Sequence, residues 1–137
     1  MKAMFSFSGG IVILISLCLF IPAVGAQESN KLEVVAAAIS KNVVAREAMD
    51  VGNRFPNSTP RLYCFTKVVG ASQPTEIVHV WSYSDVERAR VSLAVKAASW
   101  RTYSSKAIQA HEMGPWRVDV LDTSGNLLET INFEITQ

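Results

Sequence analysis

The stretch ASWRTYSSK at positions 98–106 gathers side chains that together could bind an anion. It places two cations, Arg101 and Lys106, beside the hydroxyl groups of Ser104 and Ser105. Guanidinium, ammonium and hydroxyl groups can jointly hold a carboxylate, a sulfate or a sugar acid. One hypothesis is therefore an anion-binding cradle, and the other is a strand that ends in a polar corner. The second is favoured, because strand ends rich in serine are commonly turns.

His79 and Trp81 are the other two candidates for a ligand site. Both fall in the stretch EIVHVWSY at 76–83, on the strand face that Ile77 and Tyr83 share. If this face points outward, His79 is a site residue. Beside the anion cradle, Trp81 or Trp116 could stack on a sugar ring. If the face points inward, we expect a neutral core histidine with a hydrogen-bonded ring.

A different chemistry is offered by AHEMG at 110–114. His111 and Met113 lie two residues apart, so their side chains project to the same side of an extended chain. Imidazole and thioether groups form a pair that suits copper. A complete copper centre needs further ligands, for which the available residue types are His79, Met49 and Cys64, at a spacing that matches no carrier pattern. A periplasmic copper carrier is therefore the alternative hypothesis, against a solvated His111 and a packed Met113.

Catalytic constellations are incomplete in this sequence. A serine hydrolase needs a nucleophile, a base and an orienting acid. Ser104 or Ser105, His79 and Asp119 supply the types, but no G-x-S-x-G elbow is present. An S-x-x-K motif ending at Lys106 would need a serine where Tyr103 stands. We therefore expect a protein that is not an enzyme and that carries no cofactor.

Cys64 is flanked by Tyr63 and Phe65 in a stretch that reads as a strand. We expect it to be buried as a small apolar residue, since cysteine is among the most buried residue types. A free thiol that pairs with a partner protein is the other interpretation.

The elements that must position these groups follow from hydrophobic periodicity. From residue 61 onward, apolar and polar residues alternate, which predicts strands separated by turn residues. We expect these strands at 61–69, 76–83, 90–95, 99–104, 115–122 and 127–135. Residues 31–45 read as either a helix or an edge strand, and strand is favoured; residues 49–60 read as a long polar loop. About seven strands predict an all-β fold, an immunoglobulin-like antiparallel β-sandwich.

Alternation also assigns the inner and outer side chains. Trp100 and Trp116 are expected to anchor the core, since buried aromatic rings contribute large contact areas. Arg101 would lie on the outer face, where its expected carboxylate partners on neighbouring strands are Asp119 and Glu129.

The first 26 residues differ in composition from the rest. Lys2 precedes the uncharged stretch IVILISLCLFIPAV at 11–24, and the small residues Gly25 and Ala26 follow. These are the three parts of a secretory signal peptide. We predict cleavage after Ala26, which leaves 27–137 as the β-sandwich domain, periplasmic or secreted. An uncleaved anchor is the alternative, and membrane contact would then be limited to this segment.

Charge and cysteine content limit the partners of the exported chain. The sequence has 13 Lys and Arg against 12 Asp and Glu, and loss of Lys2 leaves 12 against 12. A neutral domain lacks the positive field that nucleic acid requires, so no nucleic-acid partner is expected. Loss of Cys18 leaves Cys64 as the single cysteine, so no intrachain disulfide can form.

Five phrases, taken in their order and spacing, resemble the bacterial family called domain of unknown function 2914. They are NRFP at 53–56, RLYCFTKV at 61–68, IVHVWSY at 77–83, ASWRTYSSKAI at 98–108 and GPWRVDVLDTSGNLL at 114–128. The resemblance implies a small β-rich domain, often exported or attached to a membrane segment, and it implies no catalytic residues. It also leads us to expect a short glycine turn after HVW, where this chain has SYSDVE. The expected function is a binding or accessory module of the cell envelope, with a protein or glycan partner.

Overall fold

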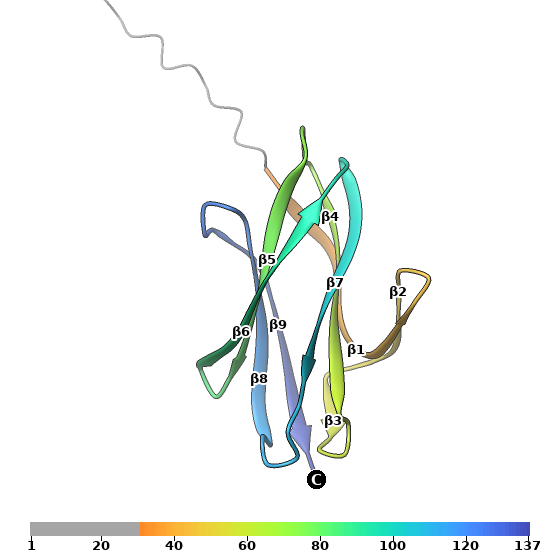
Figure 1. Cartoon of the computed structure of the whole chain (residues 1–137), viewed down its shortest axis with the longest axis vertical. Helices are drawn as coiled ribbons and strands as arrows, with labels where there is room; N and C mark the ends of the chain where they lie inside the picture. The colour runs from red at the N-terminus through yellow and green to blue at the C-terminus, as the bar shows by residue number, and fades with distance from the viewer. Residues whose placement is uncertain (1–30) are drawn as a thin grey trace, which may run out of the picture.

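The computed structural model describes residues 31–137, which form nine strands in two sheets (Figure 1). One sheet has the strand order β2-β1-β4-β7 and the other β3-β9-β8-β5-β6. The strands are β1 (Glu33–Val44), β2 (Glu47–Gly52), β3 (Arg54–Pro56), β4 (Arg61–Val69), β5 (Thr75–Tyr83), β6 (Val86–Val95), β7 (Ser99–Ala107), β8 (Gly114–Leu121) and β9 (Leu127–Thr136). The predicted signal peptide and its cleavage site lie outside the described residues.

Seven of these strands form the predicted immunoglobulin-like sandwich. Strands β1, β4 and β7 pack as one layer, and β9, β8, β5 and β6 as the other, with antiparallel pairing throughout both sets. Successive strands pass repeatedly between the layers, as in other sandwiches of this architecture. Residues 31–137 contain no helix with the length and hydrophobicity of a membrane span.

The segment before residue 61 differs from the sequence-based prediction. Residues 33–44 form a strand, as favoured, but the polar loop predicted at 49–60 is wrong, because β2 and β3 occupy part of it. Strand β2 pairs antiparallel with the second half of β1, and β3 pairs parallel with β9. Strand β2 is an edge strand held by backbone hydrogen bonds, without the apolar alternation that marks a half-buried strand. Strand β3 has only three residues, of which Phe55 is buried, and this is too short to show an alternation.

Alternating residues of the long strands fill the interior. The larger buried cluster comprises Ile39, Phe55, Leu62, Cys64, Trp81, Ile108, Trp116, Val118, Phe133 and Ile135. In it the ring of Trp116 stacks on Phe133 with centroids 5.9 Å apart, and Trp81 meets Phe133 edge-on at 6.1 Å. Trp116 is therefore the core anchor that was predicted. Trp100 is not, because it is only half-buried beside a smaller cluster.

Two tight turns use non-glycine residues with positive φ. Ser84 and Asp85 join β5 to β6 with φ of 44° and 66°, and Ala45 and Arg46 join β1 to β2 with φ of 50° and 61°. Two successive positive φ angles suit the right-handed twist of the flanking strands in a two-residue hairpin. The turn after HVW is therefore tight, although it lacks the expected glycine.

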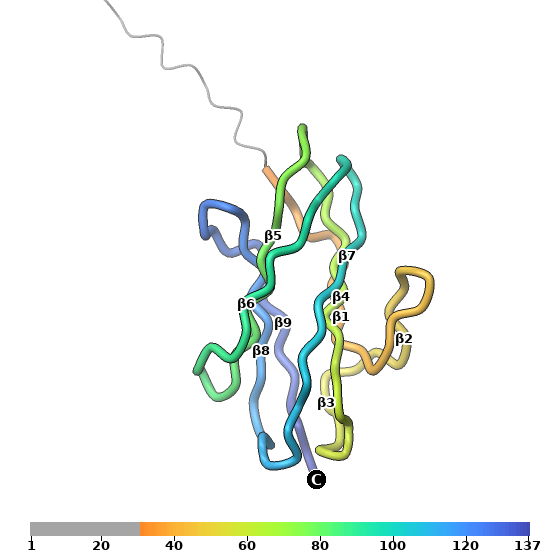
Figure 2. Tube along the Cα trace, viewed as in Figure 1, coloured from red at the N-terminus to blue at the C-terminus, as the bar shows by residue number. Residues whose placement is uncertain are grey.

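Residues 41–51, which we call the hairpin arm, stand out from the sandwich on the side of the four-stranded sheet (Figure 2). Near the tip of the arm, the Arg46 guanidinium lies 5.5 Å from the ring centroid of Trp100. An oxygen of Glu47 lies 3.7 Å from Nη1 of Arg101. Since both contacted residues belong to β7, the arm crosses the outside of the sheet and reaches its opposite edge.

Candidate functional site

A polar network lies between the two sheets, among the residues that the sequence offered for chemistry. His79 on β5 is within hydrogen-bond distance of Ser104 Oγ through Nδ1 (2.6 Å) and of Thr66 Oγ1 through Nε2 (3.2 Å). Trp81 donates its Nε1–H to the same Ser104 oxygen at 3.0 Å. All four side chains are buried. The network therefore connects β4, β5 and β7 inside the core.

One direction of hydrogen bonding satisfies every group in this network. Ser104 Oγ accepts from Trp81, so its own proton can be donated to Nδ1 of His79. Thr66 donates to the carbonyl of Thr102 at 3.4 Å, which leaves its oxygen to accept from Nε2–H of His79. We assign the neutral Nε2–H tautomer on this basis. Burial lowers the pKa of His79 from 6.5 to about 4, in agreement with a neutral ring.

This geometry assembles no hydrolytic triad. The candidate acid, Asp119, belongs to β8 and accepts hydrogen bonds from Arg117 at 3.1 Å and Thr130 at 2.8 Å rather than from His79. His79 is the inward-facing core histidine of the two possibilities considered, and neither it nor Trp81 has any exposed surface for a ligand. The network instead specifies how β4, β5 and β7 fit together, because each buried polar group needs its partner.

Cys64 is also part of the interior. It has no exposed surface, and burial raises the pKa of its thiol from 9.0 to about 12. Because the thiolate is the reactive form, a thiol held protonated in the core is a poor nucleophile. This agrees with its interpretation as a small apolar residue.

The residues of the predicted anion cradle at 101–106 point to opposite faces of the strand that carries them. Strand β7 continues to Ala107, so Ser104 and Ser105 do not end it and point to opposite faces. Ser104 is committed to the core, while Ser105 accepts a hydrogen bond from the Arg61 guanidinium at 2.8 Å. Lys106 donates to the carbonyl oxygen of Ala107 at 2.9 Å. The four cradle residues are therefore not brought together.

Arg101 lies on the outer face, as predicted, but with a different partner. Its nearest carboxylate is Glu47 of the hairpin arm, rather than Asp119 or Glu129. The antiparallel register places Lys67 of β4 directly opposite Arg101. Two cations thus face each other across neighbouring strands.

The outer side of β4 and β7 combines these cations with aromatic rings. Phe65 pairs with Tyr103 in the register, and Tyr63 pairs with Ser105. The rings of Tyr63 and Tyr103 meet edge-on with centroids 6.1 Å apart, and Tyr103 is 45% exposed. We call this surface the β4–β7 outer face, defined by Arg61, Tyr63, Phe65, Lys67, Arg101 and Tyr103. It was missed from the sequence because its two strands are more than 30 residues apart, although the outward phase of RLYCFTKVV carries four of its members.

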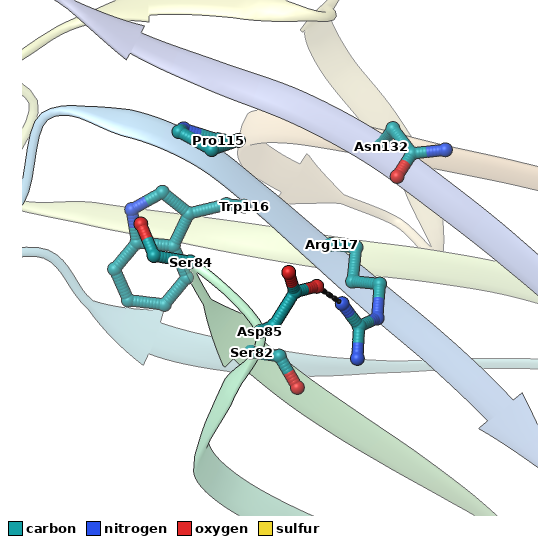
Figure 3. A pocket seen from close by; sticks show the side chains of 7 residues that line it. All are labelled: Ser82, Ser84, Asp85, Pro115, Trp116, Arg117 and Asn132. Carbon is teal, nitrogen blue, oxygen red and sulfur yellow. Dashed lines mark hydrogen bonds and ion pairs between the residues drawn. The ribbon is translucent and has the colours of Figure 1, made fainter.

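The opposite side of the sandwich has a small hollow beside the turn between β5 and β6 (Figure 3). It has a volume of about 100 Å³ and is lined by Ser82, Ser84, Asp85, Pro115, Trp116, Arg117 and Asn132. Arg117 bridges Asp119 and Asp85, and these hydrogen bonds raise the pKa of its guanidinium. The charge of this hollow is therefore neutralised internally.

The copper hypothesis rests on His111 and Met113, which lie in the loop between β7 and β8. His111 is exposed and Met113 is 38% exposed. His79 and Cys64, two of the residue types available to complete a ligand set, are enclosed in the core. Across residues 31–137, no group of three or more His, Cys, Asp or Glu side chains is placed to hold a metal ion.

Comparison with known proteins gives one family match. Residues 74–135 match the family described as protein of unknown function DUF2914, a span that runs from β5 to the end of β9. Three of the five phrases quoted for the resemblance lie within it. No curated protein matches the chain. Among solved structures, β-glucosidase from Listeria innocua in complex with glucose aligns at 11% identity with a TM-score of 0.44, covering 77% of this chain and 16% of that one.

Proposed function

We propose that this β-sandwich, whose residues 74–135 match the DUF2914 family model, is a non-enzymatic binding module of the bacterial cell envelope. Its partner is an envelope protein or glycan. The chain reaches that compartment through the N-terminal segment that has the composition of a signal peptide.

This proposal rests on where two kinds of side chain lie: the chemically reactive ones are in the core, and cations and aromatic rings are on the surface. The serine, histidine and cysteine that could perform chemistry are buried at Ser104, His79 and Cys64, and the first two are hydrogen-bonded to core partners. The outer face of the four-stranded sheet instead presents cations and aromatic rings, which recognise ligands without reacting with them.

The test uses the full chain, expressed with its own N-terminal segment and purified in its exported form. Mass spectrometry should find a chain that begins at Gln27. The protein is then applied to an array of envelope glycans and to photo-crosslinking in intact envelopes, with a probe at Tyr103. We expect saturable retention by one glycan class or one crosslinked protein. Turnover of an ester or peptide substrate that is lost in a folded Ser104→Ala variant would contradict the proposal.

A further inference from the structure

We propose that the β4–β7 outer face binds an acidic glycan, with sugar rings on its aromatic centre and the acidic groups at its cationic ends. This inference rests on the proposed function and names the ligand class of that module. The ligand would carry carboxylate, sulfate or phosphate groups on a chain of sugar residues.

The first argument is a pair of like charges on neighbouring strands. Lys67 and Arg101 are directly opposite each other on adjacent strands, an arrangement that destabilises a sheet when the charges are alike. Glu47 reaches Arg101 only at 3.7 Å, and within the described part of the chain Lys67 has no carboxylate partner. Glu47 therefore compensates the like charges only at Arg101, and a local conflict of this kind is typical of a functional surface.

The cations on the strands of the other sheet, by contrast, are paired with carboxylates. Arg54 contacts Glu134 at 3.2 Å, Arg90 contacts Glu87 at 2.8 Å, and Arg117 is held by two aspartates. The cations of the five-stranded sheet are thus neutralised by carboxylates from their own neighbourhood. On the β4–β7 outer face only Arg101 has a carboxylate partner within residues 31–137, which leaves the charges of Arg61 and Lys67 available to an anionic ligand.

The second argument is the aromatic centre between the cations. Along β4, Tyr63 and Phe65 separate Arg61 from Lys67, and Tyr103 lies beside them on β7. Aromatic side chains offer flat apolar faces with polar edges, which suits the C–H face and the hydroxyl rim of a sugar ring. Arg61 and Lys67 are six residues apart, about 20 Å along an extended strand. The spacing therefore fits an elongated ligand with acidic groups at intervals.

The third argument is access. Strand β7 ends the sheet, so the face is open along that edge. The hairpin arm crosses this face as far as Arg101 and leaves a hollow of about 320 Å³ above the small side chains of β1. Its lining comprises Ala36, Ala37, Ala38, Glu47, Ala48, Phe65 and Arg101. Two residues of the proposed site thus also line a groove in which a chain-like ligand can lie.

The mixture of rings and cations favours a glycan over other anions. A general polyanion binder would need a strongly positive chain, whereas this one carries 13 Lys and Arg against 12 Asp and Glu. An acidic peptide would pair with the cations but would offer no repeating group that packs on the rings between them. An anionic membrane would require a broad apolar surface for insertion.

Calorimetric titration of the exported full chain tests this directly. The probes are short oligomers of galacturonic acid, the same oligomers with methyl-esterified carboxylates, polyglutamate, and vesicles of phosphatidylserine. We expect saturable binding of the acidic oligomers with a Kd below about 1 mM, weakened by salt, and no comparable binding of the three other probes. Lys67→Glu and Arg101→Glu should each raise Kd about tenfold, and Tyr103→Ala should also weaken binding. Arg90→Glu changes net charge equally on the opposite sheet and should leave Kd unchanged.

Each alternative outcome has a defined meaning. Equal binding of polyglutamate or vesicles would show a site for charge alone and would overturn the glycan assignment. Loss of binding in Arg90→Glu but not in Lys67→Glu would place the site elsewhere. If no acidic oligomer binds while the array or crosslinking experiment still finds a partner, this inference fails and the proposed function stands. If neither experiment finds a partner, both fail.

Discussion

Removing the Ser104 hydroxyl should destabilise the fold far more than an exposed serine would. In Ser104→Ala the Nε1–H of Trp81 loses its acceptor at 3.0 Å, and Nδ1 of His79 loses its partner at 2.6 Å. Both groups are buried, so water does not replace the hydroxyl at either of them. Deleting one oxygen also leaves too little space for a water molecule.

The magnitude follows from counting the groups left without a partner. Each buried donor or acceptor left unsatisfied costs about 1–3 kcal/mol. Two such groups give an expected loss of about 2–6 kcal/mol in the free energy of unfolding, a large part of the total stability of a small domain. Ser105→Ala is the matched control, since the adjacent hydroxyl serves only Arg61 at the surface, and it should change stability by less than about 0.5 kcal/mol.

The assay is urea denaturation followed by tryptophan fluorescence, with linear extrapolation to water. Both variants should keep the slope of the wild-type transition, and only Ser104→Ala should shift its midpoint strongly. A loss below about 1 kcal/mol in Ser104→Ala, or equal losses in the two variants, would refute the assignment of a fully satisfied core network.

Four further outcomes are expected. Burial lowers the pKa of His79 to about 4, so the unfolded chain binds a proton at a higher pH than the folded chain does. The free energy of unfolding should therefore fall by about 3 kcal/mol between pH 6.5 and pH 4. A urea midpoint that does not change with pH, or an equal pH dependence in His79→Gln, would contradict this. Lys67→Glu should raise stability by about 0.2–1 kcal/mol by pairing with the cation opposite, seen as a higher Tm; a lower Tm would show that the like charges do not repel. Cys64 should react with thiol reagents only after denaturation, and rapid labelling of native protein would mean that the core is open. Trp116→Ala should cost about 3–5 kcal/mol in thermal or urea unfolding and the half-buried Trp100→Ala clearly less; equal losses would place both rings in the core.

Long strands with one buried face were predictable, and edge strands were not. Strands β4 and β8 alternate cleanly because the two sheets enclose one side of each, whereas β5 is buried at every residue from His79 to Ser82. Strand β2 has no such side, since most of its residues are exposed, and only its backbone pairing with β1 defines it. Local propensity carries little information about such pairing, because the partner strand supplies the interaction.

The candidate site was predicted only in part, because the register in which β4 pairs with β7 cannot be read from the sequence. Arg101 was correctly placed outside, yet the sequence alone cannot show that Lys67 lies opposite it. Ser104 was assigned to a polar corner because the strand was expected to end there; its continuation to Ala107 instead turns this hydroxyl inward toward His79. Site residues that gather from distant strands become visible only when the strand pairing is known.

The most direct measurement is a titration of the isotope-labelled full chain with oligomers of galacturonic acid, followed by amide NMR. If the domain recognises its partner through the β4–β7 outer face, shifts should concentrate at residues 61–67 and 101–105, and the amides around Arg117 should remain unchanged. Shifts confined to the hollow beside Arg117 or to the loop that carries His111 would contradict that claim.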